Sequence, residues 1–162
     1  MTKSSHAVDE WNVLRDAPHA VGLAVAVAGA SGFAGTMKEA WASASAILEG
    51  MKSDNDILKN VASKDEARAA QAALRDEVRE GEFKTVSARV QDLAVERAGA
   101  ALTLLKAKGT QQDVDAYRAF LLGIADRVAS AAKEGSFLGF GGERVSEGEK
   151  AMLARLEQTI GA

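Results

Sequence analysis

A single proline, Pro18, occurs in a chain of 162 residues, and this scarcity of helix breakers most constrains the fold. Proline removes a backbone N–H and clashes with the preceding helical turn, so a chain almost free of it can form long helices. The stretches between glycines are rich in Ala, Leu, Glu, Lys and Arg, which lose least on entering a helix. No alternating apolar run bounded by turn residues predicts a strand. We therefore expect an all-α protein.

Apolar residues recur at the three- and four-residue steps typical of helices that pack on one face, most regularly in 111–134. Capping boxes pair Thr36 with Glu39 and Ser146 with Glu149. The expected helices cover residues 8–15, 18–30, 36–49, 57–61, 67–78, 86–105, 111–134 and 146–160. The chain should thus form seven or eight helices joined by short loops.

The length fits one domain, residues 1–162. Hydrophobic residues make up 47% and aromatics 5%, so the core should consist mainly of Ala, Val and Leu. Asp16 is expected to cap a helix that carries Pro18 in its first turn and ends near Ala30. This helix is apolar nearly all round and rich in small residues, so we expect it to be the central buried element of a helical bundle.

The middle of the chain, residues 52–109, is more polar. Its narrow apolar stripes flanked by charge predict a charged helical hairpin over 64–108. Such a hairpin either packs on the bundle or projects from it. A projecting hairpin needs a partner for its apolar stripe, and self-association into a homo-oligomer, with a dimer favoured, is the simplest solution.

The sequence predicts no catalytic residues and no cofactor. It contains no cysteine and two histidines, and it lacks Glu-x-x-His, His-Glu-x-x-His, Gly-x-Ser-x-Gly and phosphate-loop motifs. The spacing of Asp16 and His19 places both on one helical face. This pair is either half of a metal site or a helix cap beside a packed histidine.

The formal net charge is −3, and no segment combines clustered Lys and Arg with aromatics, so nucleic-acid binding is not indicated. The most apolar stretch, residues 20–30, is shorter than the roughly 20 residues of a membrane-spanning helix. The first residues are polar and include acids, unlike a secretory signal. The default expectation is a bacterial cytoplasmic protein.

The most distinctive segment is the glycine-rich run 135–144, which contains Phe137, Leu138, Phe140 and Arg144. Three interpretations compete for it. The apolar side chains pack into the core around a tight reversal, or they are exposed and dock a partner or a membrane. In the third interpretation, Arg144 helps the following helix start to bind an anion.

The C-terminal third, from Ile124 to Gly135 and from Val145 to Leu156, resembles the tellurite-resistance TerB-like helical proteins of bacteria. The shared features are an Ala-rich helix, an acidic residue before glycine, a Ser-x-x-Glu helix start and a closing apolar stripe. The resemblance implies an all-α fold and divalent-metal binding by Glu134 and Glu149. The chain departs from the pattern in having Glu134 in place of Asp and an insertion at 136–144.

The leading functional hypothesis is a non-enzymatic helical protein that acts through protein–protein contacts or self-association. One alternative is peripheral membrane association through loop 137–140 or helix 18–35, against which the low Lys and Arg content near both segments argues. Another is a carboxylate metal-binding or small-ligand-binding protein, which a residual apolar cavity with buried polar groups would support.

Overall fold

The computed structural model describes residues 3–29, 32–78, 83–135 and 146–161. These residues form seven α-helices and no strand, which confirms the all-α helical bundle. Short 3-10 turns lie at Lys3–Ser5 (η1) and Gly50–Lys52 (η2). The helices are α1 Val8–Ala28, α2 Gly32–Glu49, α3 Asp56–Val61, α4 Lys64–Val78, α5 Phe83–Lys108, α6 Gln111–Gly135 and α7 Glu147–Gly161.

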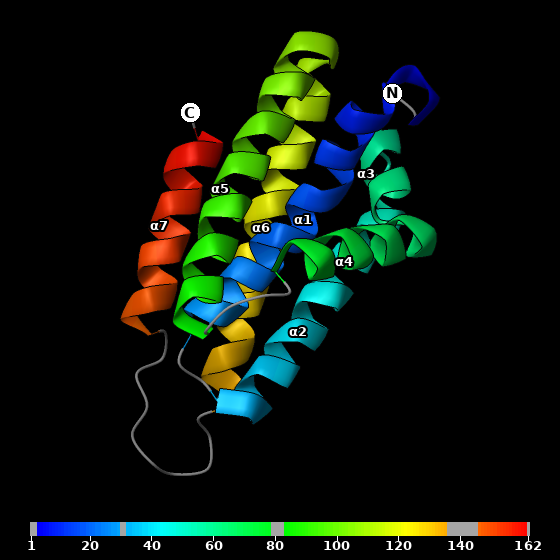
Figure 1. Cartoon of the computed structure of the whole chain (residues 1–162). Coiled ribbons are helices and arrows are strands. Elements are labelled where there is room, and N and C mark those ends of the chain that lie inside the picture. The colour runs from blue at the N-terminus through cyan, green and yellow to red at the C-terminus, as the bar shows by residue number, and fades with distance from the viewer. Residues whose placement is uncertain (1–2, 30–31, 79–82, 136–145, 162) are drawn as a thin grey trace.

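Helix α1 lies at the centre of the bundle and contacts α2, α4, α5, α6 and α7 (Figure 1). Its Leu14, Val21, Ala24 and Val25 are completely buried. Because many of its residues are Ala or Gly, several helices can approach its backbone closely. The sequence prediction of a central, small-residue apolar helix is confirmed.

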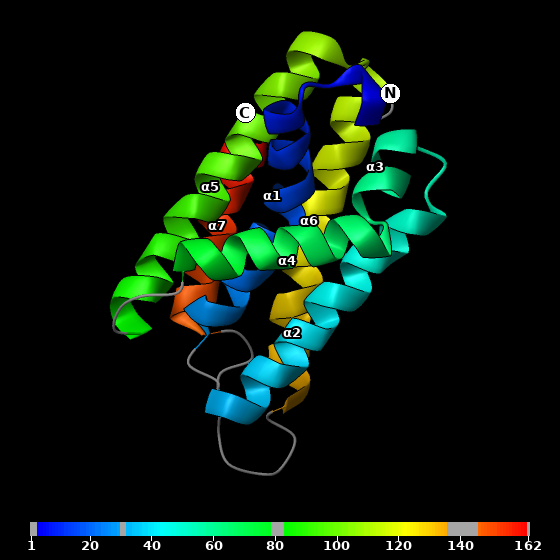
Figure 2. The ribbon, with the colours of Figure 1, turned by 45° about the vertical axis from the view of Figure 1, so that its right-hand side comes forward.

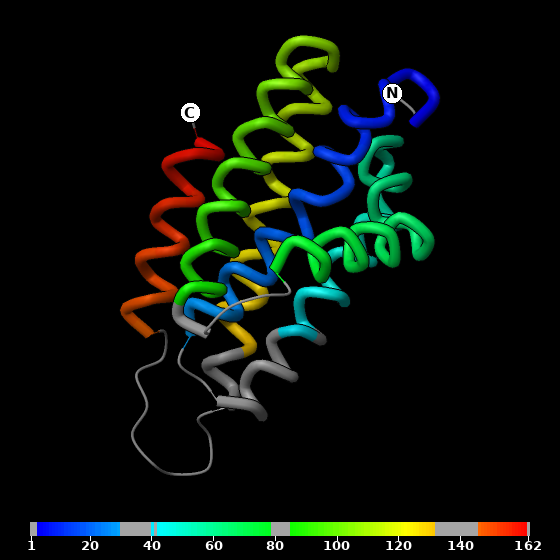
Figure 3. The backbone as a smooth tube through the Cα atoms, viewed as in Figure 1, coloured from blue at the N-terminus to red at the C-terminus, as the bar shows by residue number. Residues whose placement is uncertain are grey.

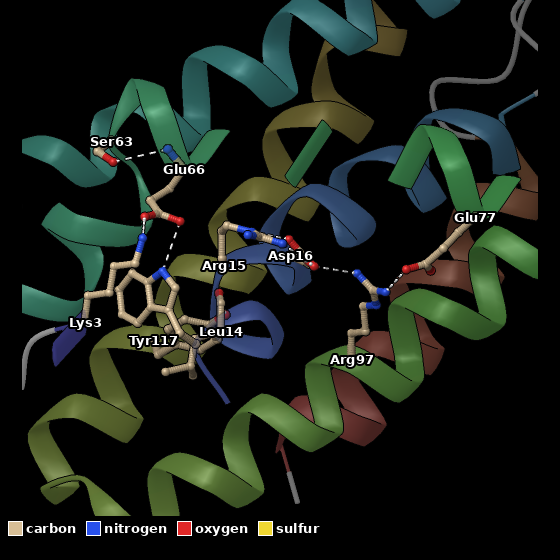
Figure 4. A network of polar contacts seen from close by, with 10 residues as sticks. Lys3, Leu14, Arg15, Asp16, Ser63, Glu66, Glu77, Arg97 and Tyr117 are labelled. Carbon is tan, nitrogen blue, oxygen red and sulfur yellow. Dashed lines mark hydrogen bonds and ion pairs between the residues drawn. The ribbon is translucent and has the colours of Figure 1, made fainter. Parts of the chain in front are cut away.

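The predicted break before Pro18 is wrong, because α1 is one helix and Asp16 lies inside it. Proline has no N–H, so Pro18 cannot donate the helical hydrogen bond to the carbonyl four residues earlier, that of Leu14. The hydroxyl of Tyr117 on α6 donates to this carbonyl instead, at 2.6 Å (Figure 4). A tertiary contact thus satisfies the group that the proline leaves without its helical donor.

Helices α5 and α6, the two longest, form an antiparallel pair beside α1 (Figure 3). The apolar face of α5 is part of the main core, in which Val90, Ala94, Ala98, Ala101 and Leu105 are buried. Helices α4 and α5 therefore pack on the bundle and do not project, and α5 belongs to its core. Small alanines at helical spacing let α5 pack closely on α1 although its other faces are charged.

Two polar side chains hold the start of α7 in the predicted way. The backbone N–H of Ser146 donates to Glu149 at 2.7 Å, and the N–H of Glu149 donates to the Ser146 hydroxyl at 3.2 Å, so this capping box is confirmed. The predicted start at Thr36 is wrong, because α2 begins at Gly32 and Thr36 lies inside the helix, where it cannot be the N-cap. No described helix is both long and apolar enough to cross a membrane.

Candidate functional site

Helix α4 crosses over α1 and α2 at a steep angle (Figure 2), and two adjoining hollows lie beneath it. The larger has a volume of about 390 Å³ and the smaller about 210 Å³. We call the two together the α4 seam. Its lining consists of His19, Gly22, Leu23 and Ala26 of α1, Ala40, Ser43, Ala44, Ile47 and Leu48 of α2, and Lys64, Ala67, Arg68, Gln71, Leu74, Arg75 and Val78 of α4.

Small side chains on α1 and α2 create this space. Gly22 and Ala26 on α1 face Ala40 and Ala44 on α2, and none of the four extends far from its backbone. Of the residues on α4, the structure buries Glu66, Ala70 and Leu74 alone, so this helix covers the seam through few apolar contacts.

Ion pairs and hydrogen bonds hold α4 at both ends (Figure 4). Near its start, the carboxylate of Glu66 accepts a hydrogen bond from the indole N–H of Trp11 at 3.0 Å and another from Lys3. Burial by itself raises the pKa of Glu66, but these two hydrogen bonds and the charges of Lys3 and Arg15 together bring the pKa below its ordinary value. Near the end of α4, Glu77 pairs with Arg97 of α5.

His19 is the most unusual side chain of the seam. Its exposed fraction is 7%, and its Nε2 is inaccessible to solvent and has no hydrogen-bond partner among the described residues. Burial lowers the pKa of His19 to about 4, against a smaller opposite effect of Asp16. The imidazole is therefore neutral at physiological pH and offers one donor and one acceptor nitrogen.

Ser43 of α2 packs directly against α1 beside His19. A Cβ atom placed on Gly22 would lie 1.9 Å from the Ser43 Oγ, so only glycine fits at this crossing. The exposed fraction of Ser43 is 9%. Two buried polar side chains, His19 and Ser43, thus lie on an otherwise apolar floor.

In the described part of the chain, the charged side chains that line the seam are all cations, and all of them come from α4. Lys64, Arg68, Gln71 and Arg75 follow one another at steps of four, three and four residues, which places them on one face of α4. No Asp or Glu occurs among the described residues that line the seam. The three cations of this row, Lys64, Arg68 and Arg75, stand out in a chain whose formal net charge is −3.

A second, more open groove of about 720 Å³ lies between α2, η2 and α6. At its rim Glu49 and Arg127 pair at 2.8 Å, and their hydrogen bond lowers the pKa of Glu49 and raises that of Arg127. Since these charges satisfy one another and the polar groups described there are not buried without a partner, the groove has less to offer a ligand than the seam.

The predicted pair of Asp16 and His19 does not act as one site. The Asp16 carboxylate is bound by Arg15 at 2.6 Å and lies 3.1 Å from Arg97, toward α5. His19 faces α2 and α4, and no hydrogen bond joins it to Asp16. The two residues share a helix but serve different contacts.

The other predicted candidates divide into two groups. Glu149 is 2% exposed and uses its Oε2 in the capping box, while its Oε1 has no partner within the described residues. The side chain of Glu134 and the whole of Phe137, Leu138, Phe140 and Arg144 lie outside what the structure describes. In the described parts of the chain no three His, Asp or Glu side chains gather in a way that could hold a metal ion.

Sequence reasoning singled out His19 and the small residues of the central helix, Gly22 among them, but missed Ser43 and the cationic row on α4. The regular steps from Lys64 to Arg75 were a usable signal for that row. No family model, no curated protein and no solved structure matches the chain. A functional interpretation therefore depends on the geometry of the seam.

Proposed function

We propose that the protein binds a small, largely apolar molecule in the α4 seam, where His19 supplies a buried hydrogen-bonding group. The larger hollow alone, at about 390 Å³, falls within the range of roughly 300–1,000 Å³ that small-molecule pockets occupy. Such pockets combine apolar walls with a few polar groups that orient the ligand, and the seam has this composition.

The unpartnered imidazole of His19 carries the proposal. Burying a polar group without a hydrogen bond costs about 1–3 kcal/mol, and an apolar side chain of similar size avoids this cost. The terminal torsion of histidine is broad, so rotation of the ring on binding would turn Nε2 toward the hollow. A ligand hydroxyl, amine or carboxyl would then satisfy it.

The test uses N-phenyl-1-naphthylamine, a neutral apolar fluorophore with one N–H donor. Its fluorescence is titrated against the wild type and against Ala44→Leu, which fills the junction of the two hollows. Overpacking a site by this much costs about 1–3 kcal/mol, so we expect the affinity for the fluorophore to fall about 5- to 150-fold. Circular dichroism confirms that the variant is folded.

Ala116→Leu is the matched control, because Ala116 is also a half-buried helical alanine but lines the α2–α6 groove. It should leave the affinity unchanged. No fluorophore binding to the wild type, or a larger loss in Ala116→Leu than in Ala44→Leu, would overturn the proposal.

Self-association is a second candidate function, favoured by the exposed apolar side chains Leu48 and Met51 at the end of α2 and in η2. A second copy of the chain is the proposed occupant of this surface. Light scattering coupled to size exclusion should show a dimer that Leu48→Ser with Met51→Ser dissociates. A monomeric wild type at all concentrations contradicts this candidate.

A further inference from the structure

The α4 seam differs from an ordinary apolar pocket in the charge of one wall. Lys64, Arg68 and Arg75 line it from α4, and no carboxylate lines it within the described residues. An apolar ligand does not need such a wall. An anionic group on the ligand does, because cations on one rim attract it from solution and orient it.

The cations at the smaller hollow are free to bind an anion. Lys64 is exposed and has no acidic partner among the described residues. Arg68 lies 3.4 Å from Asp65, with exposed fractions of 79% and 93% for the two side chains. So exposed a pair contributes little, and an incoming anion can replace it.

The larger hollow is the part of the seam suited to the apolar part of a ligand. The larger hollow is walled by Leu23, Ala26, Leu74 and Val78 and includes one cation, Arg75. Two cations, Lys64 and Arg68, belong to the smaller hollow. His19, which lines both hollows, marks their junction. A ligand that spans the seam is therefore apolar at one end and negatively charged at the other.

From this arrangement we infer that the ligand is a small amphipathic anion, with its apolar chain in the larger hollow and a carboxylate against Lys64 and Arg68. This inference rests on the proposed function of the seam. It adds the chemical class of the ligand and the residues that select it.

Decanoate and decanol test it, because they share one apolar chain and differ in charge. Each is titrated at about pH 7.5, where the carboxylate is ionised, to displace N-phenyl-1-naphthylamine. Exposed ion pairs contribute about 0.2–1 kcal/mol each, so with two cations decanoate should displace the fluorophore at a concentration about 2- to 30-fold lower than decanol. The preference should shrink as NaCl is added.

The variant Lys64→Gln with Arg68→Gln should bring the two ligands within about twofold of one another and leave decanol unaffected. Lys59→Gln with Lys106→Gln is the matched control, because it removes the same charge from exposed positions outside the seam. It should keep the preference for decanoate.

The outcomes separate the two proposals. If the fluorophore does not bind at the seam, the proposed function fails and the inference fails with it. If the fluorophore binds but decanoate displaces it no better than decanol, the ligand class alone is wrong. A preference for decanoate that survives Lys64→Gln with Arg68→Gln also overturns the inference, because the selecting charge then lies elsewhere.

Discussion

The hydroxyl of Tyr117 donates a hydrogen bond to the carbonyl of Leu14, 103 residues earlier in the chain, at 2.6 Å. Both residues are fully buried. The Leu14 carbonyl has no helical donor, because the residue four positions later is Pro18, which has no N–H. The contact therefore accounts for the continuation of α1 through a proline.

Tyr117→Phe should lower the free energy of unfolding by about 1–3 kcal/mol, because it leaves a buried carbonyl without a donor. Pro18→Ala restores a backbone N–H to Leu14. In the Pro18→Ala protein, Tyr117→Phe should therefore lower the free energy of unfolding by clearly less than in the wild type. Urea unfolding of the wild type, the two single variants and the double variant gives the coupling energy between Tyr117 and Pro18. An equal loss of stability with and without Pro18→Ala would show that the Tyr117 hydroxyl does not replace the missing donor.

His19→Leu should raise stability at neutral pH by about 1 kcal/mol, since it removes a buried nitrogen that has no partner. The same variant should bind N-phenyl-1-naphthylamine more weakly. Thermal unfolding and fluorescence titration report the two effects separately. If His19 served packing alone, His19→Leu would change stability and fluorophore affinity in the same direction or leave both unchanged.

Protonation of His19 should make the stability of the protein depend on pH between about 6.5 and 4. Its pKa of about 4 in the folded state lies below the ordinary 6.5, so the unfolded chain takes up the proton first as pH falls. The contribution is constant above pH 6.5, and up to about 3 kcal/mol is lost progressively down to pH 4. Urea unfolding across this range should show a loss in the wild type and in His6→Leu that is up to about 3 kcal/mol larger than the loss in His19→Leu.

Gly22→Ala should destabilise the protein by about 1–3 kcal/mol, because its Cβ would overlap Ser43. This sign is the reverse of the usual gain of about 1 kcal/mol when alanine replaces glycine inside a helix. Gly123→Ala is the matched control, since a Cβ there meets no atom within 4 Å, and it should be stabilising. Chemical denaturation of both variants measures the difference.

Glu66→Ala should destabilise the protein by about 1–3 kcal/mol, because the indole N–H of Trp11 loses its acceptor. Glu66→Gln keeps an acceptor and should cost less. Hydrogen exchange should speed up in α4 for the alanine variant, as expected when one anchor of a thinly packed helix is lost. Glu96→Ala, at an exposed position on α5, is the control and should leave α4 unchanged.

Most helices were predictable from local sequence. The capping box of Ser146 and Glu149 and the stripe over 111–134 are local patterns, and each has the predicted structure. The break at Pro18 could not be recognised as wrong, because the donor that compensates for it comes from Tyr117. The role of α5 was hidden for a similar reason: its buried alanines identify a core face only once α1 lies against them.

The sequence by itself determined that this protein is a bundle of helices around a small-residue helix, because helix propensity, capping and apolar spacing act over a few residues. It also determined that His19 is one of two histidines in a chain without cysteine. Only the tertiary structure decided that α4 crosses α1 and α2, leaves the seam open beneath it, and encloses the His19 imidazole there. Burial and the spacing between helices depend on contacts between distant segments, and no local pattern encodes them.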